Sequence, residues 1–175
     1  MAIKHAFVSG IADGDDTTLV RPSDWNAEHV GLKVIRKTAD ETVNNSTTLQ
    51  NDDELLFAVA ANEVWEFHML ARIISHETAE FQFAFTIPTG GSIKINTADE
   101  IGALPAHQLL LPDDGTSALY TASMATGFEY NLHIWGFYIG GANAGNVQFK
   151  WAQYVATAYN TKVLTNSFII AHKLA

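Results

Sequence analysis

The chain has 175 residues with 10 basic and 19 acidic side chains, a formal net charge of −9, and no cysteine. The acidic balance and the lack of a Lys/Arg cluster argue against nucleic acid as a partner, and the missing cysteines exclude disulfides and thiolate metal sites. No secretory signal follows Met1 and no apolar run approaches the roughly 20 residues of a membrane span. We therefore expect synthesis in a cytoplasm and no membrane partner.

Charged residues make up only 17% of the chain, whereas hydrophobic residues make up 47%. Soluble domains average roughly 25% charged residues. This composition suits a surface that neighbouring molecules partly cover, and the alternative is a β-protein surface built from Thr, Ser, Asn and Gln. The length suits one domain of about 145 residues plus an arm, and a domain of that size buries a sizeable core without disulfides or metals.

Residues 1–30 contain too few apolar side chains to fold alone, and Gly10, Gly14 and Pro22 interrupt them. Such a stretch does not bury enough surface to offset its chain entropy. We predict that residues 1–30 form an extended anchoring arm, which would span about 100 Å if fully extended. The acidic run at 13–16 lacks the glycine and glutamate positions of an EF-hand, so we expect a solvated acidic turn.

The arm also carries the candidate partner-binding residues. Pro22 favours an extended turn, and Ser23 or Asp24 is suited to cap a short helix that begins near Trp25. Arginine and tryptophan concentrate binding energy at interfaces. The candidate anchors are Phe7, Leu19, Arg21, Pro22 and Trp25. The alternative is that Trp25 folds back as a lid across one end of the domain.

Residues 31–175 show the alternation of apolar and polar side chains that is typical of strands. The clearest predicted strands are 62–75, 81–87, 128–139, 147–151 and 168–174, and weaker ones are 33–38, 55–59 and 119–124. Both faces of 128–139 are apolar, which predicts a central strand buried on both sides. Predicted turns lie at 88–91, 113–115, 140–143 and 160–162, and 98–110 has room for a helical turn.

Eight or nine short strands without helices between them predict an all-β fold, a jelly-roll-like antiparallel β-sandwich over residues 31–175. No nucleophile elbow or phosphate-binding loop is present. A metal site from His68, Glu66 and His133 and a glycosidase pair of carboxylates from separate strands are alternatives. Adjacent pairs such as Asp52/Asp53 would point to opposite faces in a strand and would be solvated in a loop. Trp135, Trp151, Tyr154 and Tyr159 are either core residues or a sugar-binding platform.

Several segments are familiar as a set: TLVRPSDWNAEH at 18–29 with residues 5–14 upstream, 55–67 and 81–88 in the middle, and 149–153 and 163–168 near the end. They resemble tailed-bacteriophage virion proteins, and the resemblance covers most of the chain. It implies a β-sandwich that often forms trimers, is attached through its N-terminal arm and has no catalytic activity. Such proteins are tail, head-fibre or capsid-decoration components.

The chain lacks the collagen-like or coiled-coil shaft of long fibres, which favours a compact cement protein. We therefore expect a capsid decoration protein that binds the major capsid protein or another virion protein as a homotrimer and stabilises the shell. It would reside in the virion, after assembly in the host cytoplasm, and would be no enzyme and need no cofactor or metal. The alternative is a tail or head-fibre adhesin that binds host-surface carbohydrate through loops at 113–116 and 140–146.

Overall fold

The computed structural model describes residues 8–27, 31–99, 107–109 and 125–175. After residue 31, the segments in which apolar and polar side chains alternate form strands. The elements in chain order are α1 (Pro22–Asn26), β1 (Leu32–Arg36), β2 (Glu41–Asn44), β3 (Gln50–Val59), β4 (Val64–Ile74), β5 (Gln82–Thr86), β6 (Ser92–Asp99), β7 (His107–Leu109), β8 (Glu129–Ile139), β9 (Gly145–Ala152), β10 (Asn160–Val163) and β11 (Phe168–Lys173).

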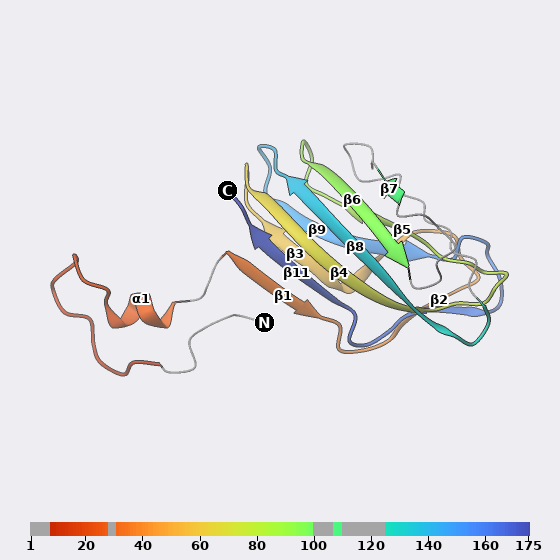
Figure 1. Ribbon diagram of the computed structural model, residues 1–175, viewed down its shortest axis with the longest axis horizontal. Coiled ribbons are helices and arrows are strands. Elements are labelled where there is room, and N and C mark those ends of the chain that lie inside the picture. The colour runs from red at the N-terminus through yellow and green to blue at the C-terminus, as the bar shows by residue number, and fades with distance from the viewer. Residues whose placement is uncertain (1–7, 28–30, 100–106, 110–124) are drawn as a thin grey trace.

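The strands form two antiparallel sheets that pack face to face (Figure 1). The larger sheet has the order β1-β11-β4-β8-β6-β7, and β10 pairs with both β2 and β4. The smaller sheet has the order β3-β9-β5. The predicted all-β antiparallel sandwich is therefore confirmed, although its two sheets are of unequal size. Residues 8–27 lie beyond the start of β1, beside the sandwich rather than across either sheet.

The core lies between the sheets and is dominated by aromatic rings. From β4, Trp65, Phe67, Met69, Ala71 and Ile73 point inward and are buried, as the alternation predicts. The Phe67 ring lies with its centroid 5.9 Å from that of Phe57 and 5.5 Å from that of Phe85, both in the smaller sheet. Each fully buried side chain of this size contributes about 1.5–3 kcal/mol to folding, so these contacts hold the two sheets together.

Gly136 allows this aromatic packing in the middle of β8. It pairs directly with Phe67 of β4. A Cβ atom at position 136 would lie 2.5 Å from the Phe67 ring and 2.8 Å from the side chain of Ile95. The glycine is needed here because a ring occupies the space of its missing side chain.

Five predicted strands are confirmed as β4, β5, β8, β9 and β11, and the weaker ones at 33–38 and 55–59 correspond to β1 and the end of β3. The turn predicted at 160–162 is wrong, because these residues form β10 and pair with both β2 and β4. Of the range 98–110, which has room for a helical turn, residues 98–99 belong to β6 and 107–109 to β7, and the others lie outside the described residues. The predicted strand at 119–124 and turn at 113–115 lie outside the described residues.

The prediction for β8 is half right. This strand is central, between β4 and β6, and Leu132, Ile134 and Tyr138 on its inner face are buried. The described residues leave its other face partly exposed, because Trp135 is 43% exposed, Phe137 51% and Ile139 48%. The smaller sheet covers only the inner side of β8.

Candidate functional site

The arm loop, as we name residues 8–27, is closed by a reciprocal pair of hydrogen bonds. The Ser9 backbone N–H donates to Asn26 Oδ1 at 2.9 Å, and Asn26 Nδ2 donates to the Ser9 carbonyl oxygen at 3.0 Å. These bonds bring residues 9 and 26 together, so this part of the arm is looped rather than fully extended. The length of about 100 Å expected for a fully extended arm therefore does not apply to residues 8–27.

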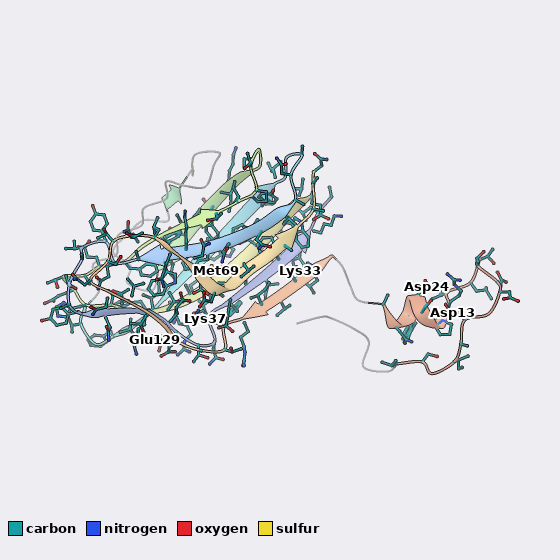
Figure 2. The ribbon with its side chains drawn as sticks, turned by 180° about the vertical axis from the view of Figure 1, so that it is seen from behind. Asp13, Asp24, Lys33, Lys37, Met69 and Glu129 are labelled. Atoms are coloured by element: carbon teal, nitrogen blue, oxygen red, sulfur yellow. The ribbon has the colours of Figure 1, made fainter. Side chains whose placement is uncertain are left out.

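Helix α1 begins three residues before the predicted start at Trp25, because Pro22 occupies its first turn, where a missing N–H costs nothing. Asp24 caps the helix from inside, since its Oδ2 accepts the Arg21 N–H at 3.0 Å. Ser23 instead donates its backbone N–H to Asp13 Oδ1 at 2.9 Å and its hydroxyl to Asp13 Oδ2. Figure 2 shows Asp13 and Asp24 together at this helix, apart from the sheets.

The acidic run contributes to the arm loop. Hydrogen bonds from the Ser23 side chain and backbone, together with the charge of Arg21, hold the pKa of Asp13 below its ordinary value. Asp16 Oδ1 accepts both the backbone N–H and the hydroxyl of Thr18, which lowers its pKa in the same way. The chain bends at Asp15 and turns at 17–18. No group of three metal-ligating side chains occurs among the residues that the structure describes.

Large apolar side chains on the arm loop face solvent. Their exposed fractions are 63% for Val8, 76% for Ile11, 64% for Leu19, 80% for Val20 and 44% for Trp25. A loop that folds by itself would bury such side chains, because their burial stabilises a fold. The arm loop leaves them exposed instead.

The structure brings three of the five predicted anchors together. Arg21, Pro22 and Trp25 line a shallow hollow of about 320 Å³, with Ser9 and Val20 completing it. Leu19 is exposed outside that lining, and Phe7 lies outside the described residues. Sequence reasoning did not single out Val20, although its place between Leu19 and Arg21 was a usable signal.

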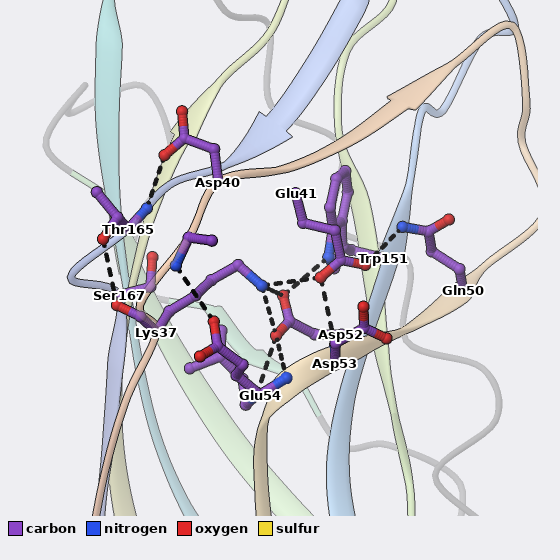
Figure 3. Close-up of polar contacts among 12 residues, drawn as sticks. Lys37, Asp40, Glu41, Gln50, Asp52, Asp53, Glu54, Trp151, Thr165 and Ser167 are labelled. Carbon is purple, nitrogen blue, oxygen red and sulfur yellow. Dashed lines mark hydrogen bonds and ion pairs between the residues drawn. The ribbon is translucent and has the colours of Figure 1, made fainter.

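A buried ionic cluster joins the end of β1 to the two sheets (Figure 3). Lys37 is 1% exposed and Asp52 is 0% exposed. The Lys37 ammonium lies 2.9 Å from both Asp52 carboxylate oxygens and 2.8 Å from Glu41 Oε2. Asp52 Oδ1 also accepts the backbone N–H of Leu55, and its Oδ2 accepts the Trp151 indole N–H at 3.2 Å. Asp52 and Asp53 lie within β3, where Asp52 is buried and Asp53 is exposed, so the alternative of opposite faces in a strand is confirmed. An irregularity in β3 between Asn51 and Leu56 accompanies the inward position of Asp52.

This cluster is suited to stability rather than to chemistry. Burial opposes the charge of Lys37, but hydrogen bonds to Glu41 and Asp52 outweigh it and raise the lysine pKa. For Glu41 burial prevails over the bond from Lys37 and raises the pKa of that carboxyl. The pKa shifts of Lys37 and Glu41 balance differently because the Lys37 ammonium hydrogen-bonds two carboxylates and contacts both oxygens of Asp52 but only one of Glu41. The charged groups of the cluster thus pair with one another inside the protein, and their contacts join β1, β2 and β3 to β9.

The second exposed apolar surface is the outer face of the larger sheet, away from the core. Opposed residues in neighbouring strands share this face, so one row crosses the sheet from β1 to β6: Val34, Ile170, His68, Trp135 and Asn96. The adjacent rows add Leu70, Phe137 and Phe168, and Ile139 extends the face along β8. We name this set of side chains the outer face.

Rings stack along the outer face. The His68 ring is nearly parallel to that of Trp135, 5° apart with centroids at 5.5 Å, and to that of His133, 16° apart at 5.9 Å. The edge of the His68 ring meets Phe168 at 6.1 Å. Burial and the neighbouring His133 lower the pKa of His68. His68 Nε2 is buried without a hydrogen-bond partner among the described residues.

A groove of about 430 Å³ runs over this face, and its polar lining comes from Glu66, His68, Asn96 and His172 beside Trp135 and Phe137. Glu66 does not join the two stacked histidines in the way that the metal alternative requires, because it contacts His172 Nδ1 at 3.1 Å. The described residues contain no metal-binding group of three.

The four aromatic residues considered as a sugar platform are not brought together. Trp151 is buried and donates to Asp52, so it belongs to the core. Tyr159 is 54% exposed and stacks on His76 with centroids 3.6 Å apart. Trp135 faces solvent on the outer face. The loop at 113–116 of the adhesin alternative lies outside the described residues.

No protein-family model matches the chain, and no curated protein matches it. A structural search matches a chain in the structure of infectious bursal disease virus, Gx strain, with 10% sequence identity and a TM-score of 0.26. The match covers 99% of this chain and spans about half of the other, 48%. A likeness at this level establishes neither a common fold nor a common function. In the described part of the chain, no helix has the length and apolar character needed to cross a membrane.

Proposed function

We propose that this chain is a structural protein of a tailed-phage virion, which decorates the outer capsid surface as a homotrimer and strengthens the shell. The sandwich formed by residues 31–175 is the exposed body, and the arm of residues 1–30 attaches it to the major capsid protein or another virion protein. The chain acts by binding and carries out no catalysis. The sequence resemblance to virion proteins supports this assignment.

One observation carries the proposal: five large apolar side chains are 44–80% exposed on a loop beside the sandwich. The loop is nevertheless shaped, because Ser9, Asn26, Asp13 and Ser23 fix it with hydrogen bonds. A pre-shaped loop loses less conformational entropy on binding than a flexible one. Trp25 and Arg21 border one hollow, as the anchors of an interface do. Several arms in one oligomer would add their affinities through multivalency.

Particle binding tests this proposal. The full-length chain is mixed with phage particles that lack it, and the bound amount is measured after sedimentation. We expect Trp25→Ser together with Val20→Ser to reduce occupancy at least tenfold, since a hot-spot residue contributes about 2 kcal/mol or more. Tyr159→Ser, a matched exposed aromatic on the sandwich, serves as the control. Undiminished occupancy with the arm variant would refute attachment through the arm.

An adhesin that binds host-surface carbohydrate is the second candidate, because the groove over the outer face combines aromatic and polar side chains. Trp135 and Phe137 offer flat apolar rings, and Glu66 and Asn96 offer groups that accept or donate hydrogen bonds to hydroxyls. A glycan array probed with the full-length chain tests this candidate. The absence of any signal at high micromolar concentration would remove it.

A further inference from the structure

We infer that the outer face of the larger sheet is the surface through which copies of this chain associate, so that a second copy covers Trp135 and Phe137. This inference deepens the proposed function, since it names the surface behind the proposed oligomer. It rests on the sheet and not on the arm loop, so the two fail independently.

The outer face is apolar, and no layer of the described residues covers it. Trp135, Phe137 and Ile139 are 43–51% exposed, and Val34, Leu70, Phe168 and Ile170 around them are half-buried. Sheets that face water on one side normally alternate apolar and polar side chains. In β8 both sides are apolar, which is the pattern of a strand with a protein layer on each face.

The outer face is also large enough for a protein interface. The outer face extends over β1, β11, β4, β8 and β6, strands of 5, 6, 11, 11 and 8 residues. With a rise of about 3.3 Å per residue and a strand spacing of about 4.8 Å, these strands present a flat area of about 650 Å². The accessible surface follows the side chains and is larger than this projection. The outer face is therefore of the same order of size as the approximately 800 Å² per partner of a standard protein interface, whereas a sugar would cover only the groove.

The charges on the outer face also favour contact between like copies. Two copies of a chain with a net charge of −9 repel each other unless they meet where the excess negative charge is absent. On these five strands the outward side chains include three cations, Arg36, Arg72 and Lys94, against two carboxylates, Glu66 and Glu129. Arg72 and Glu129 neutralise each other at 2.6 Å. The outer face is thus a place where like copies meet without strong repulsion.

His68 supplies an independent sign of a missing partner. Its Nε2 atom is buried and makes no hydrogen bond to the described residues, although buried ring nitrogens are normally paired. A polar group of a second copy, or a water held at the interface, would satisfy it. The stacked rings of His68 and Trp135 form a rigid aromatic centre, the kind of residue that dominates interface energies.

Sedimentation equilibrium of the full-length chain between 1 and 100 µM tests the inference. We expect a mass of two or more chains, and a mass of three would also support the proposed trimer. Trp135→Ser and, separately, Phe137→Arg should each raise the dissociation constant about 30-fold or more, the effect of losing one interface hot spot. Circular dichroism verifies that each variant remains folded. Tyr159→Ser, with an exposure of 54% against 51% for Phe137, should leave association unchanged.

A monomer at 100 µM would overturn the inference, and so would variants of the outer face that associate like the unaltered chain. Loss of association in the Trp25→Ser/Val20→Ser variant alone would overturn it as well, because the arm would then be the contact. If the protein is a monomer that binds a glycan, and if Trp135→Ser abolishes that glycan binding, the outer face is a carbohydrate-binding surface and the inference is overturned. If the outer face variants dissociate but the arm variant still decorates particles, the inference stands and arm attachment fails.

Discussion

Replacing Lys37 by methionine should destabilise the sandwich strongly, because the change leaves buried carboxylates without their cation. Lys37 and Asp52 are 1% and 0% exposed and lie 2.9 Å apart. Removing one partner of a buried ion pair costs about 3–5 kcal/mol. For a domain of this size that loss should lower Tm by roughly 10 °C. Urea unfolding followed by circular dichroism measures the change directly.

The matched control is Lys173→Met, which removes an ammonium 3.0 Å from Glu63 at the surface. The Lys173 side chain is 37% exposed, and an exposed pair contributes about 1 kcal/mol or less. Lys37→Met combined with Asp52→Asn should recover part of the loss, since no unpaired buried aspartate remains. If Lys37→Met changes the free energy of unfolding no more than Lys173→Met does, the structural role of the cluster is refuted.

Two further substitutions concern the larger sheet. Because burial lowers the pKa of His68 in the folded chain, the unfolded chain binds more protons once the pH falls below about 6.5, and stability should decrease from pH 7.5 to 5.5. His68→Gln should reduce this decrease in urea unfolding at the two pH values, and an unchanged slope would contradict the assignment. Gly136→Val should cost about 1–3 kcal/mol through overpacking against Phe67; a thermal melt equal to that of the unaltered chain would show that the ring moves away freely.

The strands that sequence predicts best are those in which packing and pattern agree. In β4, apolar residues at every second position from Trp65 to Ile73 are all buried. Strand β10 contains one large apolar residue, Val163, and the pattern predicts a turn at 160–162. The segment becomes a strand because β2 and β4 offer hydrogen-bonding edges on both sides. Pairing of this kind depends on tertiary context, which overrides local preference.

The candidate sites show the same division. Arg21, Pro22 and Trp25 are close in sequence, so their common hollow could be predicted from one segment. The contact between Lys37 and Asp52 could not, because it depends on an irregularity in β3 that turns an aspartate inward. Sequence correctly identified both faces of β8 as apolar. It could not show that the described residues provide no second layer over Trp135, since periodicity does not specify what covers a face.

Hydrogen exchange of the full-length chain, free and bound to particles, is the most direct test of the central claim that the arm attaches this protein to a larger shell. The account predicts that backbone amides of residues 8–27 become protected on the particle, while those of β4 and β8 keep the protection they have in the free oligomer. Unchanged exchange in residues 8–27, with new protection confined to the sandwich, would contradict it.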